Sequence, residues 1–143
     1  MLHRLLPIAA VAAIVVVPVF AADLAIEVRG VRSTEGRIYV AVHGPESKAE
    51  FPSGDGVVDR FHESARIGVI RLVAQDLPPG RYAVNAFHDE NGNGELDTNL
   101  VGIPSEGYGF ANDPVIRFGP PDFEAAAVTV GESSEVAVLT LNY

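Results

Sequence analysis

The densest group of oxygen-bearing side chains lies in a short segment near residue 90. From Asp89 to Asp97 the sequence reads DENGNGELD, which places Asp or Asn at positions 89, 91, 93 and 97. Calcium takes six to eight oxygen ligands, and a tight loop supplies them when alternate side chains turn towards one centre. Gly94 permits the sharp turn, as in the pattern D-x-[DN]-x-[DN]-G. The spacing predicts a calcium site formed by Asp89, Asn91, Asn93, Asp97 and the backbone carbonyl of Glu95.

This segment also departs from the helix–loop–helix calcium pattern. The twelfth position, which normally holds a bidentate glutamate, is Leu100. Glu106 or Asp113 could complete the ligand set from further along the chain. With so few charged ligands, the predicted dissociation constant is on the order of 10⁻⁴ to 10⁻³ M. A metal-free turn is the alternative, because Asn-Gly occurs twice here and is itself a strong turn signal.

Two histidines suggest a second chemistry. His43 and His88 each follow an alternating apolar segment, and Asp89 comes directly after His88. If both strand ends lay at one rim, His43, His88 and Asp89 would form a cluster able to hold a transition metal. The corresponding hypothesis is a metal-assisted hydrolase. The alternative is that each histidine has a purely structural role.

An aromatic pair suggests a third function. In GIPSEGYGFAN, Gly107 and Gly109 flank Tyr108, and Phe110 follows. An exposed Tyr108–Phe110 pair could stack on a sugar or a peptide. The other interpretation is a loop that plugs one end of the fold. A glycan or a protein is the expected partner in the first case.

Composition removes several classes of function. The chain has no cysteine, so thiol chemistry, disulfides and cysteine metal sites are absent. Its net charge is −9, whereas a nucleic-acid-binding domain is basic. Neither a G-x-S-x-G nucleophile motif nor a phosphate-binding loop occurs. We therefore expect a binding or structural module rather than an enzyme.

The N-terminus predicts export. Arg4 is followed by an uncharged apolar stretch up to Ala22, and small residues precede Asp23. This is the pattern of a secretory signal peptide, with cleavage after Ala21 and a periplasmic or secreted product. An uncleaved membrane anchor is the alternative, but Pro7 and Pro18 interrupt the stretch. Because Arg4 is the only Lys or Arg that cleavage removes, and no acid is lost, the remaining chain would carry a net charge of −10.

Residues 22–143 predict a single all-β domain, a β-sandwich of about seven strands. Apolar residues alternate with polar ones from 24 to 29, 38 to 43 and 82 to 87, and a further strand is expected at 67–73. Residues 32–36 predict a hairpin loop, and the sequence PPG at 78–80 predicts a turn. Two late strands are expected near 123–130 and 135–143. Residues 89–121, rich in glycine and proline, predict one long ordered loop.

Four motifs in order resemble one bacterial family. They are RGVRS at 29–33, DLPPGRYA at 76–83, HDENGNGELD at 88–97 and GIPSEGYGF at 102–110. They resemble domain-of-unknown-function family 2141, whose members are small exported proteins, and the resemblance supplies no reaction. A looser resemblance is to transthyretin-like and collagen-adhesin B-type sandwiches, which implies a transthyretin-like or immunoglobulin-like fold.

Overall fold

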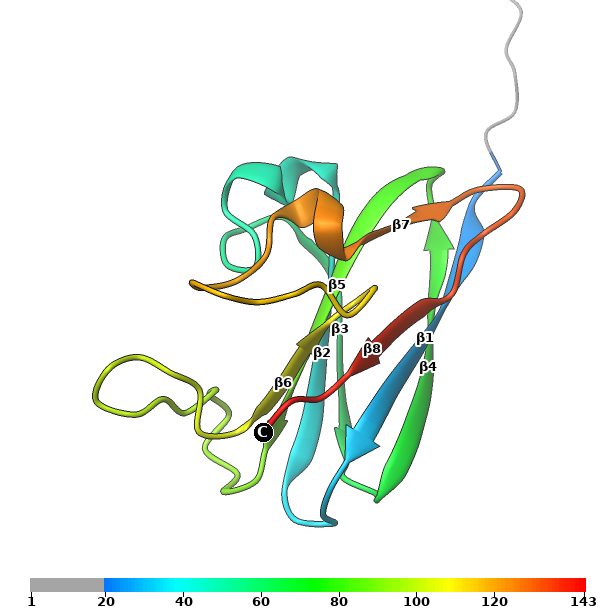
Figure 1. Cartoon of the computed structure of the whole chain (residues 1–143). Coiled ribbons are helices and arrows are strands. Elements are labelled where there is room, and N and C mark those ends of the chain that lie inside the picture. Colours follow the sequence, from blue (N-terminus) through cyan, green and yellow to red (C-terminus); the bar gives the residue numbers. More distant parts are fainter. Residues whose placement is uncertain (1–19) are drawn as a thin grey trace, which may run out of the picture.

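The computed structural model describes residues 20–143, and these form a β-sandwich (Figure 1). One sheet has the strand order β4-β1-β8, and the other has the order β3-β2-β5-β6, with β7 also pairing with β5. The eight strands are β1 (Ala22–Val31), β2 (Arg37–His43), β3 (Val57–Ser64), β4 (Gly68–Leu77), β5 (Gly80–Asp89), β6 (Gly107–Phe110), β7 (Ala127–Val130) and β8 (Ala137–Thr140). The predicted fold class is confirmed, with one strand more than the expected seven or so.

The main core lies between the two sheets, where the alternating residues of each strand meet. Leu24, Ile26 and Val28 of β1 face it from the smaller sheet, and Ile38 and Val40 of β2 face it from the larger one. All five side chains are buried, as the period-two pattern predicts. The same alternation directs the intervening residues of the larger sheet to its outer face.

Part of that outer face is covered by a second, smaller cluster. Phe110 of β6 and Phe123 of the 3₁₀ helix η2 (Phe123–Ala126) are buried in it, and Phe51 packs against them. A second 3₁₀ helix, η1 (Pro45–Ala49), lies beside η2 at one end of the sandwich (Figure 1). Beside this cover, residues of β2, β3 and β5 line an open part of the same face.

Two connections differ from the sequence prediction. Residues 32–36 do not form a hairpin, because β1 pairs with β4 and β8 whereas β2 pairs with β3 and β5. They cross from one sheet to the other. An alternating pattern reveals which face of a strand is buried, but it does not reveal the partner strand.

The late part of the chain also differs from prediction. Residues 123–126 form η2, so the strand expected from Phe123 begins only at Ala127. Residues 89–121 are not one loop, because β6 interrupts them and pairs with β5. Two separate loops result, and both project from the sandwich on the same side (Figure 1).

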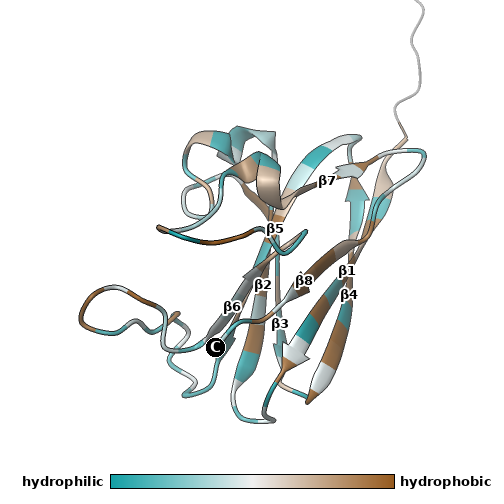
Figure 2. Cartoon of the chain, in the orientation of Figure 1, coloured by the Kyte–Doolittle hydropathy of each residue, from teal (hydrophilic) through white to brown (hydrophobic). Residues whose placement is uncertain are grey.

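Both projecting loops carry exposed apolar residues (Figure 2). Leu100 and Phe118 are fully exposed, and Val101 and Val115 are nearly so. Within residues 20–143, no helix has the length and apolar character needed to span a membrane. The predicted signal peptide falls mainly on residues 1–19, which lie outside the described part of the chain.

Candidate functional site

The loop from Asp89 to Asp97, here called the rim loop, is organised around one buried carboxylate. Asp89 is the last residue of β5 and has no exposed surface. Its Oδ1 atom accepts hydrogen bonds from the backbone N–H groups of Gly92 at 2.8 Å and Asn93 at 3.1 Å. Its Oδ2 atom accepts a third from Gly94 at 2.8 Å. A single side chain thus holds the backbone of the loop in a tight curve.

The other predicted ligands of the rim loop meet at Asp97. The amide nitrogen of Asn93 donates to Asp97 Oδ1 at 3.0 Å, and that of Asn91 donates to Asp97 Oδ2. The amide oxygens of Asn91 and Asn93 accept from backbone N–H groups two residues further on. The side chain of Glu95 is exposed, which leaves its backbone carbonyl as the group proposed to face inward. Hydrogen bonds from its own side chains therefore hold the rim loop in its curved shape.

The two acids expected to complete the shell have different positions. Glu106 is buried and accepts hydrogen bonds from the N–H of Glu90 at 2.9 Å and from that of Asp97 at 3.1 Å, so it joins the two ends of the rim loop. Asp113 instead binds the backbone N–H and the hydroxyl of Thr140. The suggestion that Asp113 serves the rim loop is therefore wrong. In the described residues, no three His, Cys, Asp or Glu side chains are grouped to hold a metal ion.

The predicted cluster of His43, His88 and Asp89 does not form. In the antiparallel pair β2–β5, His43 lies opposite Ala83 and His88 lies opposite Ile38. An offset of five residues separates the histidines by about 17 Å along the strands. His43 ends β2 and His88 is the next-to-last residue of β5, and the ends of antiparallel strands point in opposite directions. This geometry contradicts the hydrolase hypothesis.

His88 has a structural environment. It is completely buried, and its two ring nitrogens lie 2.7 Å from the Tyr143 hydroxyl and 2.7 Å from the carbonyl oxygen of Glu35. The side chain therefore connects β5 to the C-terminal residue and to the segment between β1 and β2. Nearby, Gly36 must be glycine: its φ is +66°, and a Cβ there would lie 1.8 Å from the carbonyl oxygen of Asp89.

The predicted aromatic pair is not exposed. Phe110 is only 7% exposed and belongs to the second cluster, where Phe51 and Phe123 pack near it. Tyr108 is half-buried, with its ring centroid 6.3 Å from that of Phe110. The plug interpretation describes Phe110, and the prediction of an exposed Tyr108–Phe110 pair is wrong.

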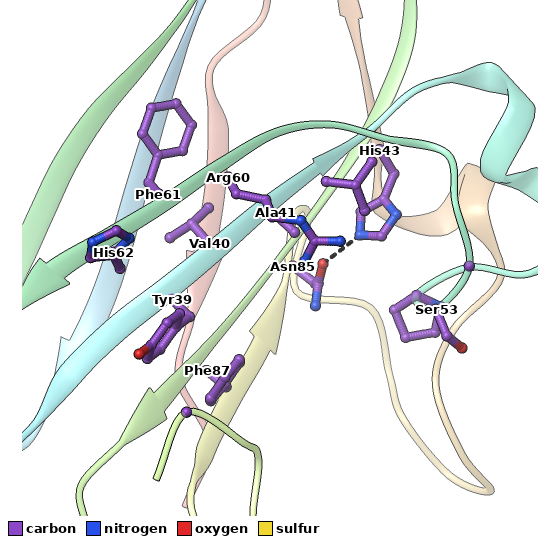
Figure 3. Close-up of a pocket in the computed structure, with 14 residues that line it drawn as sticks. Tyr39, Val40, Ala41, His43, Ser53, Arg60, Phe61, His62, Asn85 and Phe87 are labelled. Carbon is purple, nitrogen blue, oxygen red and sulfur yellow. Dashed lines mark hydrogen bonds between the residues drawn. The ribbon is translucent and has the colours of Figure 1, made fainter. Parts of the chain in front are cut away.

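An open groove on the outer face of the larger sheet was not anticipated. Strand register places His62, Tyr39, Phe87 and Tyr108 in one row across β3, β2, β5 and β6. The rings of Tyr39 and Phe87 are parallel to within 8°, with centroids 5.0 Å apart. The groove has a volume of about 430 Å³, and its side chains are shown in Figure 3.

Several hydrogen-bond donors line the same groove. His43 Nε2 lies 2.8 Å from Asn85 Oδ1, as the dashed line in Figure 3 shows. Since an amide oxygen can only accept, Nε2 carries the proton and the amide nitrogen of Asn85 stays available. Arg60 lies on the neighbouring strand, and within residues 20–143 its guanidinium forms no ion pair.

Electrostatics agree with a neutral His43. Burial lowers the pKa of this histidine below its ordinary value, the charge of Arg60 lowers it further, and the hydrogen bond with Asn85 opposes the change. His43 is 1% exposed, and its Nδ1 atom has no hydrogen-bond partner among the described residues. A neutral ring can keep its single N–H on the Asn85 side.

The groove and the rim loop are neighbours. Gly94 lines the groove, and a Cβ atom placed on it would lie 3.9 Å from the hydroxyl oxygen of Tyr39. The outward positions of Tyr39 and Phe87 could be read from the alternation in each strand. Their adjacency could not, because it depends on the register between β2 and β5.

The comparisons with known proteins identify a family. No curated protein and no solved structure matches the chain significantly. One family model matches residues 26–138, a range that includes the rim loop, the groove and nearly all of the sandwich. The four motifs noted in the sequence lie within that range. The chain therefore belongs to the family described as an uncharacterized protein conserved in bacteria, DUF2141.

Proposed function

We propose that this protein is an exported binding or structural module whose rim loop binds calcium. The carrying observation is the convergence of three predicted ligands, because Asn91 and Asn93 both contact the carboxylate of Asp97. Side chains two residues apart reach one centre only when the loop curls around it. The contacts are made by the amide nitrogens of the two asparagines. Because calcium takes oxygen ligands, we expect these nitrogens to leave Asp97 on binding and the amide oxygens to turn towards the ion.

The donor set fits calcium better than a transition metal. Asp89, Asn91, Asn93 and Asp97 offer carboxylate and amide oxygens, the carbonyl of Glu95 would add a fifth, and neither cysteine nor histidine belongs to the set. Glu106 lies against the same loop and brings another carboxylate. When bound, calcium would neutralise acids that the loop gathers together. Binding on the order of 10⁻⁴ to 10⁻³ M suits a compartment rich in calcium.

Export is the second part of the proposal, and the start of the fold supports it. β1 begins at Ala22, directly after the predicted cleavage site, and Phe20 is 74% exposed. Cleavage after Ala21 would leave every strand intact. Cell fractionation followed by N-terminal sequencing of the recovered protein tests this part. A protein that starts at residue 22 or 23 and lies outside the cytoplasm is expected, and a cytoplasmic protein that starts at Met1 would contradict it.

Thermal unfolding in a calcium titration tests the metal site. A ligand that binds only the folded state stabilises it, by about 1.4 kcal/mol at tenfold its dissociation constant. We expect the melting temperature to rise with calcium between ~10⁻⁴ and ~10⁻² M, compared with the protein in chelator. Magnesium should produce a smaller rise, since it dehydrates reluctantly and requires strict octahedral geometry.

Asp97→Asn is the informative variant for this test. It keeps the shape of the side chain and removes one ligand charge, so the calcium-dependent rise should shrink strongly. Glu132→Gln is the matched control, because Glu132 is an exposed acid in the turn between β7 and β8. A rise that is the same in both variants would show that calcium acts elsewhere. A flat response of the wild-type protein would leave the rim loop as a metal-free turn.

A further inference from the structure

We propose that the groove beside the rim loop binds an acidic sugar, a pyranose ring that carries a carboxylate. Tyr39, Phe87, Arg60 and Asn85 would be the principal contacts. The inference rests on the proposed function in one respect, that the protein is a binding module. It does not require calcium to be bound.

Charge is the first argument for an anionic ligand. The protein has an excess of acidic over basic residues, yet no Asp or Glu lines the groove. Arg60 lines it instead, together with two histidines, of which His43 is kept neutral by burial. Four other arginines of residues 20–143 form ion pairs with carboxylates, for example Arg32 with Glu90 and Arg71 with Glu27. The guanidinium of Arg60 has no such pair in residues 20–143, and a ligand carboxylate matches its bidentate geometry.

The hydrogen-bonding groups are the second argument. His43 occupies the oxygen of the Asn85 amide, which leaves the nitrogen as a donor. Tyr39 and Ser53, whose side chains carry hydroxyl groups, line the same groove. Together with Arg60, these polar groups come from three strands (β2, β3 and β5) and a loop, so they are spread around the groove. A sugar has oxygen atoms around its whole ring, whereas an aromatic acid has them at one end only.

The aromatic rings supply the third argument. Tyr39 and Phe87 are half-buried, and both line the groove with part of their ring surface. Ligand sites combine apolar and aromatic walls with a few well-placed polar groups, in volumes of roughly 300–1,000 Å³. The groove, at about 430 Å³, lies within that range. The apolar C–H face of a pyranose would contact the rings while its oxygen atoms meet the donors.

Calorimetric titration with a galacturonic acid trimer tests the inference. The full exported protein should bind the trimer saturably in chelator, and more weakly as sodium chloride increases, because the contact with Arg60 is partly exposed. The neutral galactose trimer should bind at least tenfold more weakly, the equivalent of ~1.4 kcal/mol for losing a charge-assisted contact. Equal binding of the neutral trimer would overturn the acidic assignment.

Arg60→Gln is the decisive variant. It should weaken trimer binding about tenfold, while Arg66→Gln, at another exposed arginine outside the groove, should leave binding unchanged. Both variants should melt like the wild-type protein, since each side chain is exposed. Equal affinity of the two variants, or no binding of the trimer at 10 mM (roughly the limit of a specific weak site), would overturn the proposal.

Two further outcomes separate the alternatives. Benzoate carries a ring and a carboxylate without ring hydroxyls, so it should bind more weakly than the trimer. If it binds as tightly, the ligand is an aromatic acid and the sugar assignment is wrong. The titration is done in chelator, so the two proposals are tested separately. Trimer binding without a calcium-dependent rise in melting temperature would support the sugar site in the groove and overturn the calcium site. A calcium-dependent rise without trimer binding would support the calcium site and overturn the sugar site.

Discussion

The rim loop and the groove lie side by side, but they use their polar groups in opposite ways. In the rim loop, the oxygens of Asp89 and Asp97 accept hydrogen bonds from the loop itself. In the groove, the guanidinium of Arg60 and the amide nitrogen of Asn85 have no such partner among the described residues. Polar groups that satisfy one another stabilise a fold, whereas donors left facing a cavity are available to a ligand. The difference makes the rim loop self-supporting before any ion binds, whereas it leaves the donors of the groove available to a ligand.

The largest expected effect comes from breaking the rim loop at Asp89. Asp89→Ala leaves three backbone N–H groups without their acceptor. The expected loss is roughly 2–4 kcal/mol in the free energy of unfolding, since hydrogen bonds to charged groups contribute about 1.5–3 kcal/mol each and some N–H groups will find water. Urea denaturation measures this loss.

The loss in Asp89→Ala should be large even in chelator, because the hydrogen bonds do not depend on an ion. Asp55→Ala serves as the control, since Asp55 is an exposed acid in another loop. If Asp89→Ala cost nothing in chelator, the rim loop would not be self-supporting, and the comparison with the groove would fail.

A smaller effect is expected from His43, at the boundary of the groove. Because burial lowers the pKa of His43 in the folded state, the unfolded chain binds a proton more readily than the folded one. The resulting stability is fully present above pH ~6.5, the ordinary histidine pKa, and is lost as the pH falls through the lower folded-state value. The melting temperature should therefore decrease between pH 7 and pH 5.

His43→Gln isolates this contribution. Glutamine can still bond to Asn85 but does not titrate, so its melting temperature should decrease less over the same pH range. All other side chains are the same in the two proteins, so the difference between their pH curves reports on His43. Glu27, Glu90 and Glu124 have lowered pKa values because of their arginine or lysine partners, and they stay ionised above pH 5. Parallel pH curves for the two proteins would contradict the neutral His43.

The smallest effect on stability is expected at Arg60. Since its guanidinium makes no ion pair in the described chain, Arg60→Gln should change the melting temperature by less than about 3 °C, as is usual for surface substitutions. Differential scanning calorimetry measures this shift. A destabilisation close to that of Asp89→Ala would show that Arg60 supports the fold, and the contrast between groove and rim loop would disappear.

Local patterns in the sequence were sufficient to predict which strand residues face the core and where the chain turns tightly. Alternation identified Leu24, Ile26 and Val40 as inward residues, because the side-chain period of a strand is two whatever its partners are. The spacing of Asp89, Asn91 and Asn93 likewise indicated a tightly curved loop. Both features depend on neighbours within a few residues.

Relations between distant segments were beyond the reach of those patterns. Residues 32–36 appeared to be a hairpin, although β1 and β2 belong to different sheets. His43 and His88 appeared able to meet, although antiparallel pairing sends them to opposite ends. The sequence left open whether Tyr108 and Phe110 form an exposed pair or a plug, and it is η2 and Phe51 that bury Phe110. In each case the sequence pattern did not reveal which strand pairs with the segment or which other segment covers it.

The sequence by itself determined that this chain is an acidic β-sandwich with an ordered, oxygen-rich loop, because strand periodicity and Asx turns are local properties of the chain. Only the tertiary structure decided which outward residues became a site. The stacking of Tyr39 on Phe87, the position of Arg60 in the groove and the burial of Phe110 all follow from register and from long-range packing. The register itself is set by the burial of the whole core, since a shift of one residue in register would exchange the buried and exposed faces of a strand.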